Sequence, residues 1–248
     1  MHPEVSVIIP FYDNLVFLKR AINSVIYQNF RNYEIILIYD NPRNKKNLIF
    51  LKEIKNKYSR VRLLLNKTNL GAGYSRNRGI KIARGKFIAF LDSDDVWKRN
   101  KLFFQINFMK KNNFLVTHTS YDIVNLKNSF VKKRLAFDLG YPDLKNSCDI
   151  GLSTVIISKS LLIKTSLFPR LKTKEDYVLW LSITKKGLIF KGLKKSFTKW
   201  TRRPDSLSSS TFQKLKDAFN VYYKYENYGL IKTIKCVLVL SINFLIKR

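Results

Sequence analysis

Residues 87–95 read FIAFLDSDD, an uninterrupted apolar run followed at once by an acidic turn. A run without polar residues, such as Phe87 to Leu91, is typical of a strand covered on both faces of a parallel sheet. Ligands of such sheets bind beyond the carboxyl ends of the strands, so Asp92-Ser93-Asp94-Asp95 is expected at a ligand crevice. Its carboxylate oxygens suit Mg²⁺ or Mn²⁺. The same acids also fit an N-terminal cap of the helix expected from about residue 97.

Strands and helices alternate in the chain before this run. The expected strands are 5–9, 34–39, 61–65 and 87–91, and the expected helices between them are 15–26, 45–57 and 74–83. This βαβαβαβ rhythm predicts an α/β fold with a mostly parallel sheet flanked by helices.

The pattern becomes mixed after about residue 112. Strands are expected at 114–121 and 155–158, helices at 176–186, 212–228 and 230–248, and a polar, irregular stretch at 122–149. We expect an α/β domain over residues 1–210 and a helical tail over residues 211–248.

Two segments of the first half add candidate ligands to the acidic turn. Asp40 follows the second expected strand and should line the same crevice, although Asp40-Asn41-Pro42 is also good turn chemistry. In the loop after the third strand, Gly71 and Gly73 allow a tight turn or a close approach to a ligand. Arg76, near the start of the expected helix, could bind a phosphate there. It also occupies the third glycine position of a dinucleotide-binding fingerprint, so that fingerprint is excluded.

Two segments of the second half carry further candidates. Glu175-Asp176 opens an expected helix and is either an acid pair favoured by the helix dipole or a general base. An aspartate is ionised at neutral pH, so as a base it would need only correct placement. Arg202 to Ser208 is a basic, turn-forming segment that fits closure over a diphosphate or a solvated loop.

Taken in order, these segments resemble the large inverting glycosyltransferase family 2, which has the GT-A fold. The matching segments are the opening strand Val5 to Tyr12, the S-x-x-x-Q of Ser24 to Gln28, the N-x-G-x-x-x-x-R-N-x-G of Asn69 to Gly79, the DxD of Asp92 to Asp94, and the E-D-x-x-L-W of Glu175 to Trp180. The match runs from about residue 4 to about residue 210, and the ordered combination is specific. The chain departs from the family after the second strand, where Tyr39 replaces the first of two acids.

The resemblance implies a role for each matching position. Pro10, Tyr12 and Asp40 would hold the nucleotide base, Arg76 would anchor the nucleotide, Asp92 would contact ribose or nucleotide, Asp94 would ligate Mn²⁺ or Mg²⁺, Asp176 would be the catalytic base, and Glu175, Trp180, Arg203 and Ser206 would contact acceptor or diphosphate. The implied reaction is inverting transfer from a nucleotide sugar, by preference a UDP-sugar, to a hydroxyl of a glycan or lipid-linked glycan. Surface polysaccharide or lipooligosaccharide synthesis is the implied setting. The sequence leaves the sugar, the linkage and the oligomeric state open.

The charge balance is also compatible with a second class of function. Lys and Arg number 47 against 17 Asp and Glu, a formal net charge of +30 that attracts polyanions. With 18 Phe and 13 Tyr, a basic stacking surface for nucleic acid is the main alternative. The chain has no RNA- or DNA-binding motif, so we expect no nucleic-acid partner. A glycosyltransferase-like scaffold without catalysis is the other alternative.

The tail predicts contact with a membrane surface. Residues 236–246 read CVLVLSINFLI, with Lys232 and Lys235 before them and Lys247-Arg248 after them. The run falls short of the roughly 20 apolar residues that span a bilayer, and its flanking cations suit a helix lying on anionic lipid. A helix packed on protein is the alternative. With no visible signal peptide and no disulfide pattern, we expect a cytoplasmic protein on the inner face of the membrane.

Overall fold

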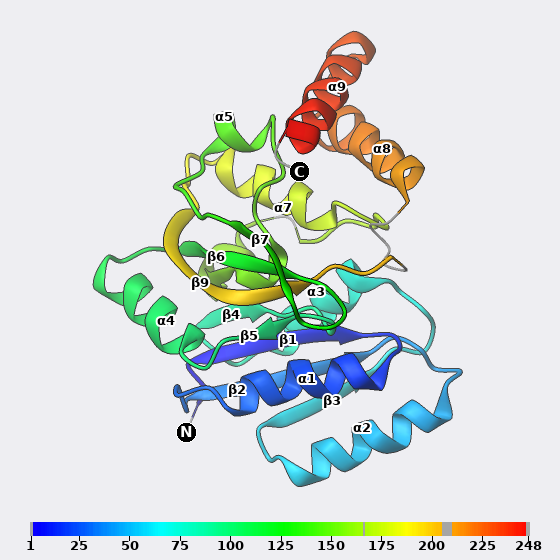
Figure 1. Cartoon of the computed structure of the whole chain (residues 1–248), viewed down its shortest axis with the longest axis vertical. Helices are drawn as coiled ribbons and strands as arrows, with labels where there is room; N and C mark the ends of the chain where they lie inside the picture. The colour runs from blue at the N-terminus through cyan, green and yellow to red at the C-terminus, as the bar shows by residue number, and fades with distance from the viewer. Residues whose placement is uncertain (1, 166, 205–209, 247–248) are drawn as a thin grey trace.

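A mixed α/β sheet organises the chain in the computed structural model, which describes residues 2–165, 167–204 and 210–246 (Figure 1). The strands are β1 (Val5–Phe11), β2 (Tyr33–Tyr39), β3 (Val61–Leu65), β4 (Phe87–Phe90), β5 (Val96–Trp97), β6 (Val116–Val124), β7 (Phe130–Arg134), β8 (Ile156–Ser158) and β9 (Lys191–Thr201). They form one sheet in the order β3-β2-β1-β4-β8-β6-β9-β5, with β7 paired to β6.

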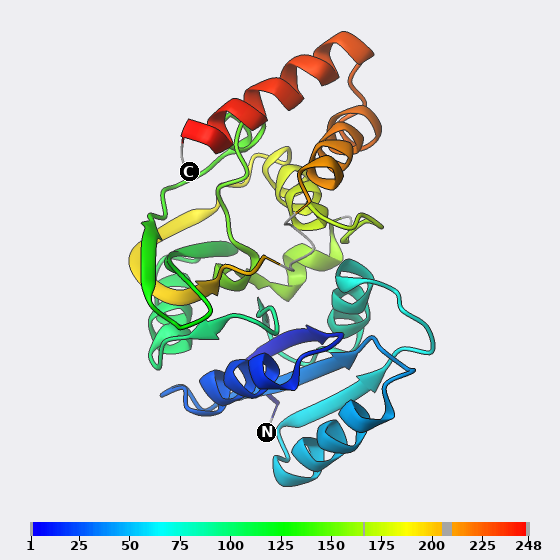
Figure 2. The ribbon, with the colours of Figure 1, turned by 45° about the vertical axis from the view of Figure 1, so that its right-hand side comes forward.

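Helices cover both faces of this sheet (Figures 1 and 2). They are α1 (Leu15–Ile26), α2 (Lys45–Lys57), α3 (Ala72–Ile82), α4 (Lys101–Lys111), α5 (Tyr141–Leu144), the 3₁₀ turn η1 (Leu152–Thr154), α6 (Lys159–Ile163), α7 (Glu175–Thr184), α8 (Thr211–Asn220), the π-helical turn η3 (Val221–Tyr225) and α9 (Leu230–Ile246). The four expected strands of the first half and the three helices between them are therefore confirmed.

The first four strands form the parallel part of the sheet. Ile8 of β1 pairs with Ile36 of β2 on one side and with Phe90 of β4 on the other. Every residue of these three strands is buried, which explains why their sequences do not alternate. Ile8 packs in the cluster that contains α3 and α7, whereas Val7 and Ile9 pack in the cluster that contains α1 and α4. The sheet thus holds a core on each face.

The second half of the sheet is mixed. β8 runs antiparallel to β4, β6 runs antiparallel to β8, and β9 runs parallel to β6. The stretch 122–149, expected to be irregular, contributes the end of β6 and the whole of β7. The sequence did not indicate β9 either, because four lysines interrupt its eleven residues. Their aliphatic stems cover the sheet while their charged ends reach water.

The C-terminal helices share the main core. Ala218, Val221, Tyr222 and Leu240 lie in the same hydrophobic cluster as Ile8 and Trp180. The division expected at residue 210 therefore does not separate two cores. The expected helix 212–228 passes from α8 into a π turn and ends before Asn227, whose φ of 55° is left-handed.

Candidate active site

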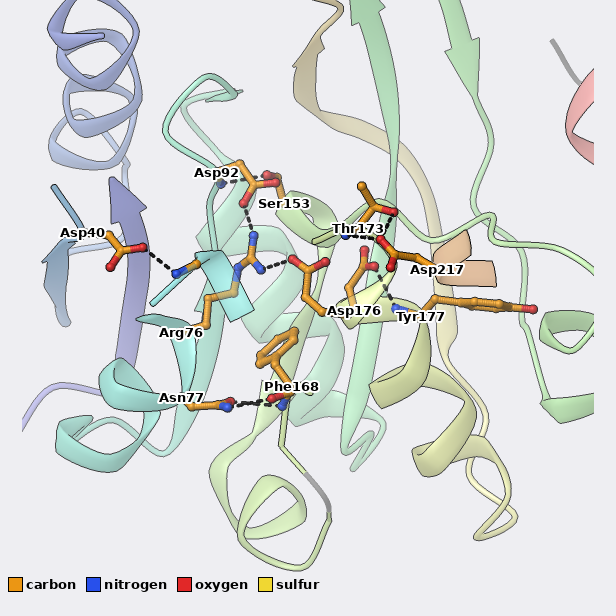
Figure 3. A network of polar contacts seen from close by, with 12 residues as sticks. Asp40, Arg76, Asn77, Asp92, Ser153, Phe168, Thr173, Asp176, Tyr177 and Asp217 are labelled. Atoms are coloured by element: carbon orange, nitrogen blue, oxygen red, sulfur yellow. Dashed lines mark hydrogen bonds and ion pairs between the residues drawn. The ribbon is translucent and has the colours of Figure 1, made fainter. Parts of the chain in front are cut away.

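The centre of the candidate site is an arginine that bridges two carboxylates from distant parts of the chain (Figure 3). Arg76 of α3 donates through Nη2 to Asp92 Oδ1 at 2.7 Å and through Nη1 to Glu175 Oε1 at 2.6 Å. Its side chain is only 4% exposed, and the two carboxylates raise its pKa against the opposing effect of burial. The bridge joins the turn after β4 to the start of α7, and loss of Arg76 would leave the largely buried Glu175 carboxylate without its ion pair.

Asp40 shapes the loop that leads into α3. Its Oδ1 accepts from the backbone N–H of Leu70 and from Asn66 Nδ2, at 2.8 and 2.5 Å, and its Oδ2 accepts from the N–H of Gly71 at 2.8 Å. Gly71 has φ of 82°, a conformation that glycine adopts without strain. The structure thus uses the Asp40 carboxylate to order the loop, and its predicted contact with the base stays a prediction.

The start of α3 lies directly against α7. A Cβ on Gly73 would stand 3.1 Å from Glu175 Cγ and 3.1 Å from the carbonyl oxygen of Pro169. One turn later, Asn77 exchanges two hydrogen bonds with the backbone of Phe168, whose ring lies under the Arg76 guanidinium at 5.4 Å. Gly73 and the motif residues Arg76 and Asn77 therefore all join α3 to α7 and to the segment before it.

Asp95, the last residue of the acidic turn after β4, anchors this turn to the rest of the fold. Asp95 is 1% exposed and accepts from Ser153 Oγ at 2.6 Å and from the Thr201 N–H at 3.0 Å. Ser153 Oγ also accepts from the Asp92 N–H. Burial and the charges of Asp94 and Asp92 raise the pKa of Asp95 well above its usual range. Sequence reasoning missed both anchors: Asp95 was visible as a third acid, whereas Ser153 carries no sequence signal.

Asp94 is the candidate metal ligand. Burial and the neighbouring charge of Asp92 raise its pKa to about 6, against the opposing charge of Arg203, whose Nη1 lies 3.4 Å from Asp94 Oδ2. An excess of negative charge of this kind fits a divalent cation. Among the described residues, no group of three or more His, Cys, Asp or Glu side chains is arranged to hold a metal. A cation at Asp94 would therefore need further oxygen ligands from a substrate, as Mg²⁺ commonly takes from phosphates.

Asp176 lies beside Glu175 at the start of α7 and is half-buried. Burial and the charge of Glu175 raise its pKa to about 7, while Arg76 and the Tyr177 N–H oppose the rise. The sequence alone suggested a carboxyl that is ionised at neutral pH. With a pKa of about 7, a substantial part of it is protonated there. A general base is most effective when its pKa lies near the pH of the reaction, so a pKa of about 7 suits this role better than the usual value of an aspartate.

The residues expected at the nucleotide are placed around the end of β1. Tyr12 is 51% exposed and lines an open cavity of about 570 Å³, whereas Pro10 is buried in the strand. The other lining residues are Asn41, Arg43, Asn44, Lys45 and Lys46. The loop that departs from the family pattern after Asp40, together with the start of α2, therefore gives this cavity three basic lining residues.

Two of the residues expected to contact a substrate are Trp180 and Ser206. Trp180 has 0% exposure and packs against Phe168 and Phe190 in the core, so its contact with a substrate stays a prediction. Almost every residue of α7 is buried, which accounts for its place in the core. Ser206 lies outside the described residues.

Comparison with known proteins settles the family. The family profile described as glycosyl transferase family 2 matches residues 6–170. The chain belongs to this family. The glycosyltransferase is 38% identical over 220 residues to the UDP-Glc:alpha-D-GlcNAc-diphosphoundecaprenol beta-1,3-glucosyltransferase WfgD of Escherichia coli, covering 88% of this chain and 84% of WfgD.

A second relative agrees with this assignment, and a solved structure shares the fold. The glycosyltransferase is 32% identical over 247 residues to WfaP of Escherichia coli, which is named for the same activity as WfgD, covering 98% of this chain and 95% of WfaP. The crystal structure of S. aureus TarS 1–349 in complex with UDP-GlcNAc superimposes with a TM-score of 0.70 at 20% identity, over 94% of this chain and 70% of that one. This likeness confirms the GT-A fold.

Proposed function

We propose that this glycosyltransferase moves a sugar from a UDP-sugar to a hydroxyl of a lipid-linked glycan, with inversion at the anomeric carbon. The observation that carries the proposal is the Asp92–Arg76–Glu175 bridge, because it brings the DxD turn and the acid Asp176 to one place. A donor diphosphate at the turn and an acceptor hydroxyl at the start of α7 would then meet across this bridge.

The donor would lie at the carboxyl ends of β1 and β2. Tyr12 offers an exposed ring for the base, and Pro10 and Asp40 support the strand end and the loop behind it. Asp92 and Arg76 would face the nucleotide from the far side, and Arg203 would approach the diphosphate. UDP is the preferred nucleotide because WfgD and WfaP are named for UDP-Glc and the TarS structure holds UDP-GlcNAc.

Asp94, beside Asp92, would hold Mn²⁺ or Mg²⁺ together with the diphosphate oxygens. The cation supplies positive charge against the negative charge that develops on the leaving nucleoside diphosphate. Burial and the charge of Asp92 raise the pKa of Asp94 to about 6, so a cation beside this carboxylate would offset both effects.

Asp176 would accept the proton of the attacking hydroxyl. The deprotonated oxygen then attacks the anomeric carbon from the face opposite the diphosphate, which inverts the configuration. Burial and the charge of Glu175 raise the pKa of Asp176 to about 7, so the carboxylate is a stronger base than an ordinary aspartate and is still largely ionised above that pH.

The acceptor would reach the site from a membrane surface. WfgD and WfaP are named for a diphosphoundecaprenol-linked acceptor. No described helix combines the length and the hydropathy needed to cross a bilayer. One face of α9 is nevertheless exposed and apolar, carrying Ile231, Ile234, Leu238, Val239, Ile242 and Leu245. We therefore place the protein peripherally on the anionic inner face of the cell membrane, in surface-polysaccharide synthesis.

A transfer assay tests this proposal. The protein is incubated with UDP-glucose, Mn²⁺ and a synthetic α-GlcNAc-diphospholipid, and the product is analysed by NMR. We expect a β-linked glucose on the acceptor and loss of transfer with a chelator. A product with the α configuration, or no transfer to the diphospholipid from any of a panel of UDP-sugars, would contradict it.

A further inference from the structure

The turn that carries Asp176 is not capped by its own residues. The N-cap position of α7 is Lys174, whose φ of 63° and ψ of 15° are left-handed and whose side chain makes no capping hydrogen bond. A lysine in this conformation costs free energy that asparagine or glycine would avoid. The conformation of the turn must therefore be held by contacts from elsewhere in the fold.

Asp217 of α8 supplies the first of these contacts (Figure 3). Its carboxylate is buried, and Oδ2 accepts from the Thr173 N–H at 2.9 Å, from Thr173 Oγ1 at 2.8 Å and from Gln213 Nε2 at 3.0 Å. Hydrogen bonds to an ionised acceptor are about twice as strong as neutral ones. Thr173 precedes Asp176 by three residues, so α8 holds the chain directly before the acid.

Tyr177 supplies a second contact directly after the acid. Its hydroxyl donates to the carbonyl oxygen of Leu144 at 2.5 Å and lies 3.0 Å from the Tyr222 hydroxyl of η3. Tyr222 in turn donates to the carbonyl oxygen of Lys145 at 2.8 Å. Thr173 is thus held by α8, while Tyr177 is held by the carbonyl oxygen of Leu144 and by an edge-on ring contact with Tyr222.

We propose that Asp217 is a positioning residue for the reaction: its bonds to Thr173 hold the turn that presents Asp176 to the acceptor hydroxyl. The proposal rests on the proposed role of Asp176 as the base. Displacement of a reacting group by about 1 Å can cost about 10²-fold in rate, so a turn held from outside gives the C-terminal helices a direct effect on turnover. Asp217 itself does not need to touch a substrate.

Four variants test the proposal. Thr173→Val removes the hydroxyl donor with little change in shape, Asp217→Ala removes the acceptor, and Thr173→Ser keeps both hydrogen bonds. Thr233→Val is the matched control, because Thr233 is a buried C-terminal threonine whose hydroxyl bonds only locally, to the carbonyl oxygen of Tyr228 at 3.3 Å. Each variant is assayed with UDP-glucose, Mn²⁺ and the α-GlcNAc-diphospholipid, and UDP binding is measured by calorimetry.

We expect kcat to fall about tenfold in Thr173→Val and further in Asp217→Ala, while the Kd for UDP stays within about twofold. Thr173→Ser and Thr233→Val should keep the wild-type kcat. If Asp217→Ala does not fold, the comparison of Thr173→Val with Thr173→Ser decides. Equal kcat in Thr173→Val and wild type, or equal losses in Thr173→Val and Thr233→Val, would overturn the proposal.

A second readout does not depend on turnover. The groups that face Asp176 are Glu175, Arg76, Asp92 and Cys148, and its pKa depends on its place among them. A carboxyl-carbon NMR titration should show a changed pKa of Asp176 in Thr173→Val and an unchanged one in Thr233→Val. An unchanged value in both overturns the positioning role. Absence of transfer by the wild type, or full activity of Asp176→Asn, would instead reject the proposed function.

Discussion

At the scale of single residues, the site consists of acids held at close range by one arginine. Asp92 and Glu175 are both paired with Arg76, and Asp95 is held by Ser153 and Thr201. Asp94 and Asp176, whose pKa values are raised to about 6 and about 7, are left to bind a cation or to accept a proton. This is the arrangement expected where charges are tuned for a reaction.

The role of Asp176 as base predicts a severe loss in Asp176→Asn, because the amide keeps the shape of the side chain and cannot accept the proton. We expect kcat to fall about 10²- to 10⁴-fold, with the Kd for UDP nearly unchanged. The measurement is a transfer assay paired with calorimetry. Asp138→Asn serves as the control, because Asp138 is an exposed acid paired with Lys191. Near-normal turnover in Asp176→Asn would exclude it as the base.

The raised pKa of Asp176 predicts a pH dependence with a definite sign. Below about pH 7 the carboxyl is protonated and cannot accept a proton, so kcat/KM should rise about tenfold per pH unit and level off above that value. Removing the charge of Glu175 in Glu175→Gln should move the inflection to lower pH, because Glu175 raises the pKa and Arg76 lowers it. The profile is measured at saturating Mn²⁺. An inflection that stays in place in Glu175→Gln would show that another group controls the profile.

At the scale of elements, the sequence predicted the parallel part of the fold well. The strands β1, β2 and β4 are covered on both faces, so each is mostly apolar, and α1 has a clear apolar stripe. The acids at the strand ends could be placed near one another by topology alone. Of the candidate residues, Arg76, Asp92 and Glu175 are brought into direct contact.

The remaining elements depend on contacts that the sequence does not encode locally. β9 is rich in lysine and becomes a strand by pairing with β6 and β5. Trp180 belongs to a motif that suggested function, yet it lies in the core because α7 is buried on nearly all sides. Asp217 and Ser153 act on residues 44 and 58 positions away, and no local pattern signals such pairs.

The close approach of α3 to α7 predicts that Gly73→Ala disturbs the site. The added methyl would stand 3.1 Å from Glu175 Cγ, so Glu175 or the segment at Pro169 must shift, at a cost of about 1–3 kcal/mol in the free energy of unfolding. We expect a lower midpoint in thermal unfolding and reduced turnover.

Gly229→Ala is the matched control, since a methyl there would meet nothing within 4 Å. Its stability should stay within about 0.5 kcal/mol of the wild type. If Gly73→Ala matched this control in both stability and turnover, the close contact between α3 and α7 would not contribute to the stability or the activity of the site.

At the scale of the whole molecule, the C-terminal helices join the core on one side and expose an apolar face on the other. Leu240 packs in the main cluster, while Leu238 and Ile242 are more than half exposed. The exposed face lies at the end of the molecule opposite α2 (Figures 1 and 2). With a net charge of +30 on the chain, this end fits an anionic bilayer.

Membrane attachment through this face predicts that two charges on it weaken binding to lipid. We expect Leu238→Glu/Ile242→Glu to lose most co-sedimentation with vesicles of mixed phosphatidylglycerol and phosphatidylcholine, with unchanged thermal stability. Ile49→Glu is the control, because Ile49 is 61% exposed on α2, far from α9. Vesicle binding that survives the double substitution would assign the α9 face to a protein contact instead.

The central claim is that Asp94 and Asp176 serve one substrate complex across the Arg76 bridge. A crystal structure with UDP and Mn²⁺ tests it most directly. We predict Mn²⁺ bound to Asp94 and to the diphosphate, the uracil beside Tyr12, and the Asp176 carboxylate facing the space where the anomeric carbon would lie. A diphosphate bound away from the turn at residues 92–95, or an Asp176 side chain directed away from that space, would contradict the account.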